Sequence, residues 1–534
     1  MFGKSKPSKF KLDFEKEQTA DTAINLSSRY GRAATTIATA ESFHKKQDRT
    51  DPISHILEAV EKKENYYGQT FEDNKPFTIP QDEITHSIFV GSTGTGKGVI
   101  LQNRVFQSIK EKKGCIIVDP KNDHFLPQIC IETLEKFGRK DDFEMCFFPN
   151  FWSYKSITED DTYLEMANKM IDMFNLQPSS NPGVDHFRKL SRTILKRVLK
   201  MFFVDLTFKK HIRKDFLDIK KHIILLKTDL EKMKLYELEI SKNRPNAELL
   251  EKFSKRYFDP QILDELYFNK SDVDSLESLV INFDEVTEGM TFTETLDIKE
   301  ALYNGKVVYI RVDMNSISSL SFVKLLIVDI IQKAKKRTAN TDIYLDELSF
   351  YGTSTLAGAL ATTRSMGLNF SMFLQAISQL NEEIRDDILE NSNQKIFYKS
   401  SNLTTLKYIE EVGGMEAISK ISNKDGTVSY SQDFEKYLNT TKIRALPRTS
   451  VAIVISEYLA KPQIIQTNFI ATKKLFDWSV YFNKKVDLSA DKNIKVDLKE
   501  DKKKLEKYRV FLKENKSLLE NSDLFGVVLG SESI

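Results

Sequence analysis

One glycine-rich segment carries the strongest chemical signal in the sequence. It follows an apolar run at residues 86–90 and precedes helically spaced apolar residues that begin at Val99. In a strand–loop–helix arrangement, glycines let backbone N–H groups surround a phosphate, while the helix N-terminus and a lysine add positive charge. We therefore predict an ATP site with Lys97 on the phosphates. The predicted binding residues are Gly91, Ser92, Thr93, Gly94, Thr95, Gly96, Lys97, Gly98 and Val99.

The residue after the lysine departs from the usual pattern. A Ser or Thr hydroxyl normally ligates Mg²⁺ at this position, and this chain has Gly98. Two weaker interpretations follow: a degenerate loop that binds nucleotide without turning it over, or a chance glycine cluster. The strand and helix around the loop, and the motifs downstream, favour an active site.

A second candidate element is the apolar run 343–345, which ends in Asp346 and Glu347. The first carboxylate suits Mg²⁺, and the second suits a base that orients and deprotonates the attacking water. The next apolar run, residues 368–374, ends in Gln375, which could sense the terminal phosphate. Taken singly, a solvated strand end and an ordinary loop glutamine are the competing interpretations.

Arg364 lies between these two runs, just before Gly367. It is a candidate arginine finger, which would act on the nucleotide of a neighbouring subunit. The alternative is that Arg364 only stabilises the C-terminal end of its own helix, where a positive charge is favourable.

Apolar periodicity predicts the elements that must position these residues. Strands expected at residues 86–90, 114–120 and 143–148 alternate with helices at 97–109 and 125–137, which is typical of a doubly wound α/β core. The pattern becomes helical over about 158–283, and strands return at 306–312, 342–345, 369–374, 395–398 and 451–456. We thus predict a nucleotide-binding domain at 51–157 and 284–474, an inserted all-α domain at 158–283, a flexible arm at 1–50 and a charged tail with one helix at 475–534.

Composition narrows the class of protein. The chain has 534 residues, with 79 Lys and Arg against 77 Asp and Glu, so no global basic charge indicates nucleic acid. Cys115, Cys130 and Cys146 lack metal-ligand spacing. No apolar run approaches the roughly 20 residues of a membrane helix. We expect a cytoplasmic protein that reaches the inner face of the membrane, if at all, through partners.

The predicted helical insertion holds a local concentration of basic residues. It could follow a phosphate backbone, although a solvated helix face is the more common explanation. The residues are Lys196, Arg197, Lys200, Lys209, Lys210, Arg213, Lys214, Lys220 and Lys221.

Several motifs together resemble the TraG/TraD family of coupling ATPases of type IV secretion and conjugation. The loop 94–99 looks like the family's form, in which glycine often follows the lysine. Residues 118–123 resemble its second strand motif, and 345–348 its acidic strand. Residues 364–367 and 375–380 are similar to its arginine-glycine and glutamine motifs, and 391–398 and 446–448 to later landmarks. The resemblance extends over about residues 81–470.

This resemblance implies a RecA-like P-loop NTPase core with an inserted all-α domain, and a homo-hexamer that substrate could induce. It also implies ATP and Mg²⁺ as cofactors. The implied cargo is DNA, a relaxase–DNA complex or protein effectors, delivered to type IV secretion components. Family members usually have N-terminal membrane helices, which are not evident here. Two alternatives stay open: an FtsK/HerA-like DNA-pumping ATPase unconnected with secretion, and a nucleotide-regulated adaptor without turnover.

Overall fold

The computed structural model describes residues 52–71, 73–121, 123–147, 151–208, 216–232, 270–288, 291–424 and 427–478. They fall into two compact units. The first unit holds the described parts of Met1–Tyr154 and Gly289–Phe476, and the second those of Lys155–Glu288 and Asp477–Ile534. The predicted arm at residues 1–50 and most of the predicted tail lie outside the described residues.

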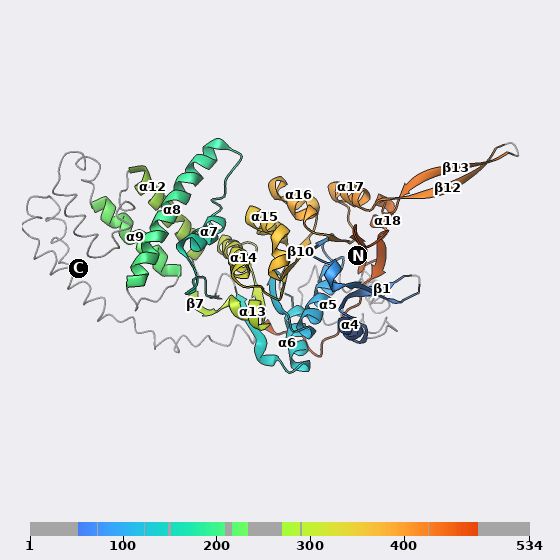
Figure 1. The fold of residues 1–534 in the computed structure, drawn as a ribbon, viewed down its shortest axis with the longest axis horizontal. Coiled ribbons are helices and arrows are strands. Elements are labelled where there is room, and N and C mark those ends of the chain that lie inside the picture. Colours follow the sequence, from blue (N-terminus) through green and yellow to red (C-terminus); the bar gives the residue numbers. More distant parts are fainter. Residues whose placement is uncertain are drawn as a thin grey trace, which may run out of the picture. The chain divides into compact units, whose positions relative to one another are not determined.

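A mixed sheet of thirteen described strands forms the centre of the first unit (Figure 1). Its middle is parallel, in the order β11-β3-β10-β9-β4-β8-β5. Antiparallel pairing adds β14, β15, β1 and β2 beyond β11, and joins β6 to β5, with β7 outermost. The strands are β1 (Glu64–Thr70), β2 (Pro76–Pro80), β3 (Ser87–Val90), β4 (Gly114–Asp119), β5 (Phe143–Phe147), β6 (Phe151–Tyr154), β7 (Thr291–Leu296), β8 (Val307–Arg311), β9 (Thr341–Leu345), β10 (Leu368–Leu374), β11 (Gln394–Phe397), β14 (Ser450–Ile455) and β15 (Gln463–Gln466).

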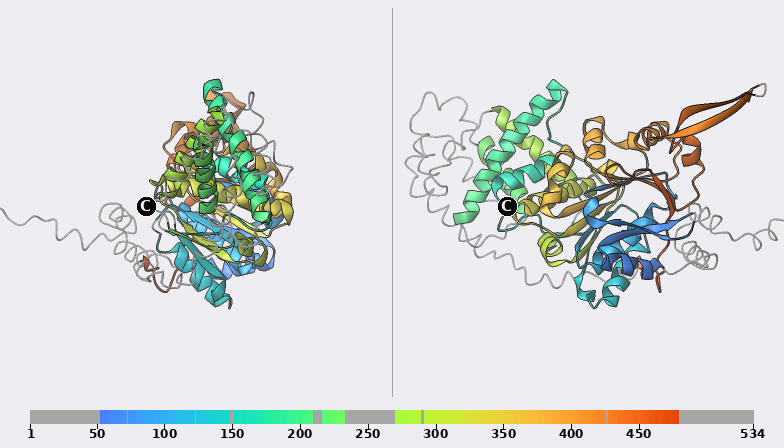
Figure 2. Two further views of the ribbon diagram at one scale, coloured as in Figure 1. Left: turned by 90° about the vertical axis from the view of Figure 1, so that its left-hand side faces the viewer. Right: turned by 45° about the vertical axis from the view of Figure 1, so that its right-hand side comes forward.

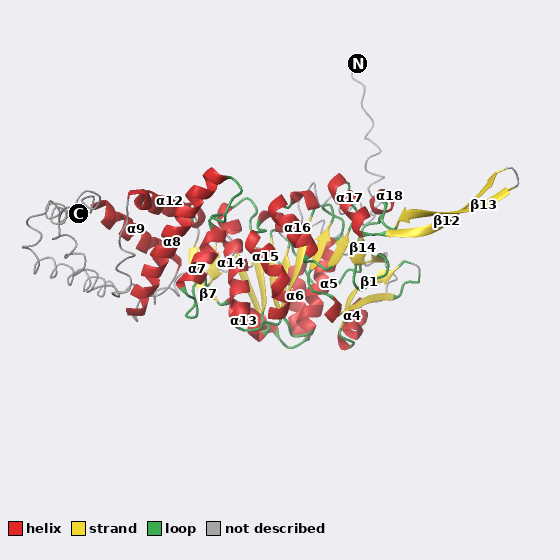
Figure 3. Ribbon diagram, turned by 45° about the horizontal axis from the view of Figure 1, so that its top comes forward, coloured by secondary structure: helices red, strands yellow, loops and turns green. Residues whose placement is uncertain are grey.

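Helices connect and flank these strands (Figure 3). Among the described contacts, α5 packs against α4 and α6, and α15 packs against α14 and α16. The α-helices of this unit are α4 (Pro52–Glu61), α5 (Lys97–Lys110), α6 (Leu126–Lys136), α13 (Ile298–Asn304), α14 (Ile317–Lys336), α15 (Ser354–Thr363), α16 (Glu382–Glu390), α17 (Leu403–Val412) and α18 (Thr440–Arg444). Short 3-10 turns occur at η1 (Gln81–Glu83), η2 (Lys140–Asp142), η4 (Leu348–Phe350), η5 (Arg364–Met366) and η6 (Ile377–Gln379).

The α/β core predicted from the alternation of apolar runs is confirmed. Strands β3, β4 and β9 are buried along their whole length, as expected for strands covered by helices on both faces.

The thiols of Cys115 and Cys130 are also buried, which raises the pKa of each above its ordinary value. The sequence analysis did not predict β1, β2, β6, β7 or β15, most of which are short or lie toward the ends of the sheet.

The described part of the second unit is helical (Figure 2). Helix α8 (Pro182–Phe208) packs against α7 (Tyr163–Met173) and α12 (Lys270–Thr287), which also packs against α9 (Phe216–Lys232). Apolar residues of α8 and α9 form the core of this unit, and Leu195, Leu199, Phe202, Ile219 and Ile223 are buried. Of the predicted basic residues, Lys209, Lys210, Arg213 and Lys214 lie outside the described residues. Lys220 and Lys221 form ion pairs with Asp284 and Asp218.

A two-stranded ribbon extends away from the sheet, near α17 and α18 (orange in Figure 1). Strands β12 (Met415–Lys424) and β13 (Thr427–Lys436) pair in antiparallel register over ten residue pairs. At the base of the ribbon, Met415 is 60% and Phe434 is 67% exposed. Sequence analysis did not predict this ribbon, because no strand pattern was assigned between residues 398 and 451.

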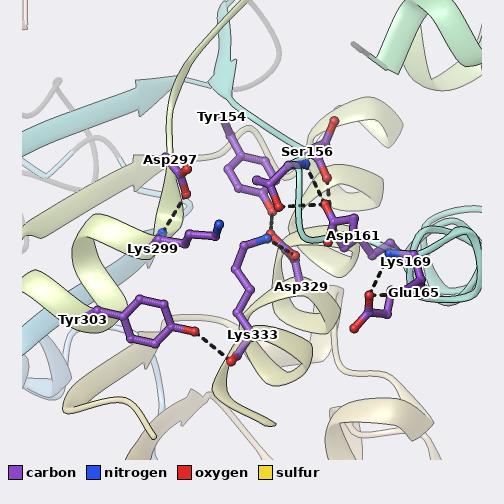
Figure 4. A network of polar contacts seen from close by, with 12 residues as sticks. Tyr154, Ser156, Asp161, Glu165, Lys169, Asp297, Lys299, Tyr303, Asp329 and Lys333 are labelled. Atoms are coloured by element: carbon purple, nitrogen blue, oxygen red, sulfur yellow. Dashed lines mark hydrogen bonds and ion pairs between the residues drawn. The ribbon is translucent and has the colours of Figure 1, made fainter. Parts of the chain in front are cut away.

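Each of the two units contains a buried ion pair, and Figure 4 shows their residues. In the first unit, Tyr154 at the end of β6 donates a hydrogen bond to Asp329, which also pairs with Lys333 at 2.5 Å on the next turn of α14. In the second unit, Lys169 pairs with Asp161 at 3.0 Å and donates to the Ser156 carbonyl at 3.1 Å. Removing one partner of such a pair would leave an uncompensated buried charge.

His86 precedes β3 and is fully buried at the amino end of the sheet. The Phe370 N–H donates to its Nδ1 at 3.1 Å, so the proton lies on Nε2, which is 3.0 Å from the Leu360 carbonyl. Burial first, and the charge of Arg364 in addition, lower the pKa of His86 to about 4, although the Leu360 carbonyl favours the charged form.

We expect the first unit to lose stability as the pH falls from 6.5 to 4. In this window the unfolded chain takes up a proton at His86 that the folded protein does not, so stability decreases by about 3 kcal/mol by pH 4. Urea unfolding at several pH values measures the slope. His86→Gln should flatten the slope, whereas the exposed His186→Gln should leave it unchanged. Equal slopes for all three proteins would contradict the assignment to His86.

Candidate active site

The order of the parallel strands brings the predicted site residues to one edge of the sheet. Strand β10 lies between β3 and β9 and is parallel to both. The loop after β3, the acidic pair after β9 and Gln375 after β10 therefore emerge side by side, at the carboxyl edge where ligands bind in such sheets. The backbone confirms this proximity, since the Gly91 N–H donates to the Leu374 carbonyl at 3.1 Å.

The glycine loop has the backbone conformation that its glycines allow. Gly94 and Gly96 have φ angles of 77° and 110°, in the region that side chains disfavour. A Cβ on Gly91 would lie 2.3 Å from Tyr398, so the loop can lie this close to β11 only with a glycine there. Helix α5 begins at Lys97, and its N-cap is Gly96 with no capping side chain. Helices α7, α14 and α15 are instead capped by Thr162, Ser316 and Thr353. The first N–H groups of α5 are thus not bound by a capping side chain and can serve an anion.

A distant segment, Arg448–Thr449, lies against the outside of the loop. The Thr449 N–H donates to the Thr95 carbonyl at 2.9 Å, and Arg448 Nε donates to the Gly94 carbonyl at 3.0 Å. A Cβ on Gly96 would lie 2.9 Å from the Thr449 Cα. Sequence analysis noted 446–448 only as part of the family resemblance and did not place it at the site. More than 350 residues separate Arg448 from Gly94, so no local pattern could indicate this contact.

Lys97 is buried at the base of the loop and 6% exposed. Its ammonium group donates to the Gly91 carbonyl and, at 3.4 Å, to the Ser92 carbonyl. Burial and the nearby charge of Lys121 lower the pKa of Lys97 to about 8, although Glu347 and Asp346 favour the charged form. A phosphate at the loop would supply the negative charge that this buried ammonium group lacks.

Asp346 and Glu347 directly follow β9, and both side chains are almost completely buried. Glu347 has a φ of 56°, an unusual value for a residue with a side chain. This turn lets the two carboxylates lie on the same side of the strand end, because consecutive residues of a regular strand would point to opposite faces. Gln375 Nε2 donates to Glu347 Oε1 at 3.1 Å, so the predicted pair of base and sensor is in direct contact.

Two further charged residues complete the cluster, and sequence analysis did not name either as a site residue. Lys121, after β4, pairs with Asp346 at 2.5 Å and with Glu347 at 3.4 Å. Burial acts to lower the pKa of Lys121, but Asp346, Asp119 and Glu347 outweigh it and raise the pKa. Burial and the charge of Asp346 raise the pKa of Asp119 to about 7, and Tyr309 donates a hydrogen bond to this carboxyl group. The pattern Asp-Pro-Lys at the end of a buried strand was the available signal.

The donor set fits a magnesium ion with nucleotide. Carboxylates are the protein ligands that Mg²⁺ prefers, usually one or two of them together with water and phosphate oxygens. Glu347 Oε2 and the Tyr351 hydroxyl are buried and have no hydrogen-bond partner among the described residues. Gly98 supplies no hydroxyl, and a Cβ there would meet nothing within 4 Å.

Arg364 is the predicted site residue that the fold does not bring to this edge. It precedes β10, whose other end carries Gln375, so about 20 Å of strand separates it from the loop. Its exposed guanidinium donates to the Asp82 carbonyl at 2.9 Å. Arg364 therefore cannot contact the nucleotide site of its own chain in this fold, and any contribution must be to another subunit.

Comparisons with known proteins find similarity both in sequence and in fold. Residues 340–450 match the family described as "TraM recognition site of TraD and TraG", a stretch that runs from just before β9 to the first residue of β14. Over this stretch the chain resembles the TraG/TraD family. The resemblance seen in the sequence is thereby confirmed. No curated protein matches the sequence.

The fold is similar to that of the coupling protein TrwB. The unbound bacterial conjugative coupling protein TrwBdeltaN70 has a TM-score of 0.52 and 14% identity over 78% of this chain and 93% of that chain. The plasmid coupling protein TrwB, solved with the GTP analogue GDPNP, has a TM-score of 0.50 and 15% identity over 79% of this chain and 95% of that chain. Among the described helices, none has the length and apolar character that crossing a membrane would require.

Proposed function

We propose that this protein is an ATP-hydrolysing motor that couples a DNA, nucleoprotein or protein substrate to a type IV secretion or conjugation machine. The observation that carries the proposal is the convergence of Lys97, Asp346, Glu347 and Gln375 at one sheet edge. The similarity of residues 340–450 to the TraG/TraD family supports the assignment. The TrwB structure with a non-hydrolysable GTP analogue supports nucleotide binding by this fold.

The residues take distinct parts in hydrolysis. The loop amides and Lys97 bind the β- and γ-phosphates of ATP. Asp346 holds Mg²⁺, whose chemistry is to neutralise charge that develops on the phosphate oxygens. Glu347 accepts a proton from the attacking water, and Gln375, in contact with Glu347, positions that water and senses the terminal phosphate.

The first unit is proposed as the nucleotide-binding motor and the second as the part that selects cargo. The first carries all the residues of the cluster, and the second is a separate helical unit inserted into its chain. The cargo is DNA, a relaxase–DNA complex or a protein effector, and the working form is a homo-hexamer. The family description names TraM recognition, which supports an interaction with conjugation components. The proposed location is the cytoplasm, with membrane association through partners.

A second candidate function is that of a nucleotide-regulated adaptor that does not hydrolyse ATP. Gly98 favours it, because the hydroxyl ligand for Mg²⁺ is missing. The contact between Gln375 and Glu347 argues for the motor, since an adaptor needs no paired base and sensor. Steady-state phosphate release by the purified full-length protein separates the two functions.

Replacing Lys97 tests the nucleotide site. Lys97→Ala should weaken ATP binding by roughly 10- to 100-fold, because charge-assisted hydrogen bonds contribute about 1.5–3 kcal/mol each. Fluorescence titration with a labelled ATP analogue measures the affinity. Lys110→Ala, at the far end of the same helix, is the matched control and should bind as the wild type does. Wild-type affinity in Lys97→Ala would exclude the loop as the phosphate site.

A further inference from the structure

Lys121 occupies a position that motor function alone does not explain. Its side chain is 37% exposed, whereas those of its partners Asp346 and Glu347 are 6% and 3% exposed. Its backbone N–H donates to Asp119 Oδ1 at 2.8 Å, which holds the turn after β4 and aims the side chain at the acidic pair. Within the described part of the chain, no other basic side chain lies within ion-pair distance of either carboxylate.

The alternative counter-ion, Lys97, is directed elsewhere. Its ammonium group donates to loop carbonyls, and the charges of the two lysines repel one another. The two lysines therefore have different partners. Lys97 contacts the carbonyl groups of the phosphate loop, and Lys121 neutralises the carboxylates. Asp119 adds a third acidic group beside them. Without Lys121, three neighbouring carboxyl groups would face one another with little compensating charge.

We propose that Lys121 is a built-in counter-ion that competes with a divalent cation for Asp346 and Glu347. An ammonium group and a divalent cation compete for the same carboxylate oxygen, so a metal ion that binds Asp346 Oδ2 would displace Lys121 from it. Its partly exposed, four-carbon side chain can move outward without disturbing the buried core. The cluster thereby binds a free divalent cation weakly and binds it well only together with nucleotide phosphates. This inference rests on the proposed nucleotide site and deepens it.

The test uses Mn²⁺ as the probe and the full-length protein in the absence of nucleotide. Electron paramagnetic resonance titration gives the affinity for Mn²⁺ directly. Lys121→Gln should bind Mn²⁺ about tenfold or more tightly than the wild type, because a positive charge next to the carboxylates is removed. Lys121→Arg keeps the charge and should bind as weakly as the wild type. The exposed Lys140→Gln, on η2, is the control and should also bind like the wild type.

A second measurement separates this inference from the nucleotide site itself. Binding of a labelled ATP analogue without metal reports on the loop and Lys97, independently of Mn²⁺. Failure of all the proteins to bind the analogue would reject the proposed nucleotide site and leave the Mn²⁺ comparison readable. Equal Mn²⁺ affinity of Lys121→Gln and the wild type, or tighter binding by Lys121→Arg, would overturn the counter-ion role. Thermal unfolding of each variant verifies that it is folded.

Discussion

Glu347→Gln is expected to bind ATP and to hydrolyse it about 10²–10⁴-fold more slowly than the wild type, the usual loss when a general base is removed. Glutamine has the same shape and still offers an oxygen to Gln375, which now contacts Glu347 at 3.1 Å. It cannot take the proton from the attacking water. Binding and turnover should therefore separate in this one variant.

The measurement is phosphate release under saturating ATP, with affinity followed by the labelled analogue. Glu382→Gln changes a glutamate on α16 whose side chain is 88% exposed, and it should retain full activity. Wild-type turnover in Glu347→Gln would remove Glu347 as the base. The unusual φ of Glu347 would then serve only to place Asp346. Loss of both binding and turnover would indicate damage to the site rather than to the proton transfer.

Arg364→Ala should lower turnover by about 10³–10⁵-fold if the residue is an arginine finger, the range known for such contacts. The fold excludes a role in its own site, because Arg364 lies at the amino end of β10 and the loop lies at the other end. An exposed guanidinium at that edge can reach a nucleotide bound to the next subunit of a ring. The competing role is a helix-end charge with one hydrogen bond to Asp82, worth about 0.3–1 kcal/mol.

Mixed rings distinguish the two roles of Arg364. Arg364→Ala and Glu347→Gln subunits should each be almost inactive alone, and co-assembly should restore part of the activity. Some interfaces in the mixture then pair an intact Glu347 with an intact Arg364. Native mass spectrometry verifies that the rings contain both subunits. Full activity of Arg364→Ala alone, or no recovery in verified mixed rings, would leave only the helix-end role. Arg385→Ala, on the neighbouring helix α16, is the control for loss of a surface arginine.

The amino-acid sequence by itself determined the elements that depend on near neighbours in the chain. The glycine loop between an apolar run and a helix predicted β3 and α5, because both the backbone freedom and the apolar spacing are local properties. The acidic pair after β9 and the amide after β10 were equally visible at the ends of buried strands. Their roles in catalysis remain predictions until the variants are measured.

The tertiary structure alone decided which of these elements meet. Placing β10 between β3 and β9 brings Gln375 to Glu347, and the same sheet order moves Arg364 to the opposite edge. The contacts of Lys121 with Asp346 and of Thr449 with Thr95 join segments more than 200 residues apart. Periodicity reports only which face of an element is buried, whereas strand order depends on how all the elements pack together. The residue types of the site are therefore visible in local sequence motifs, whereas their contacts with one another depend on the strand order of the folded sheet.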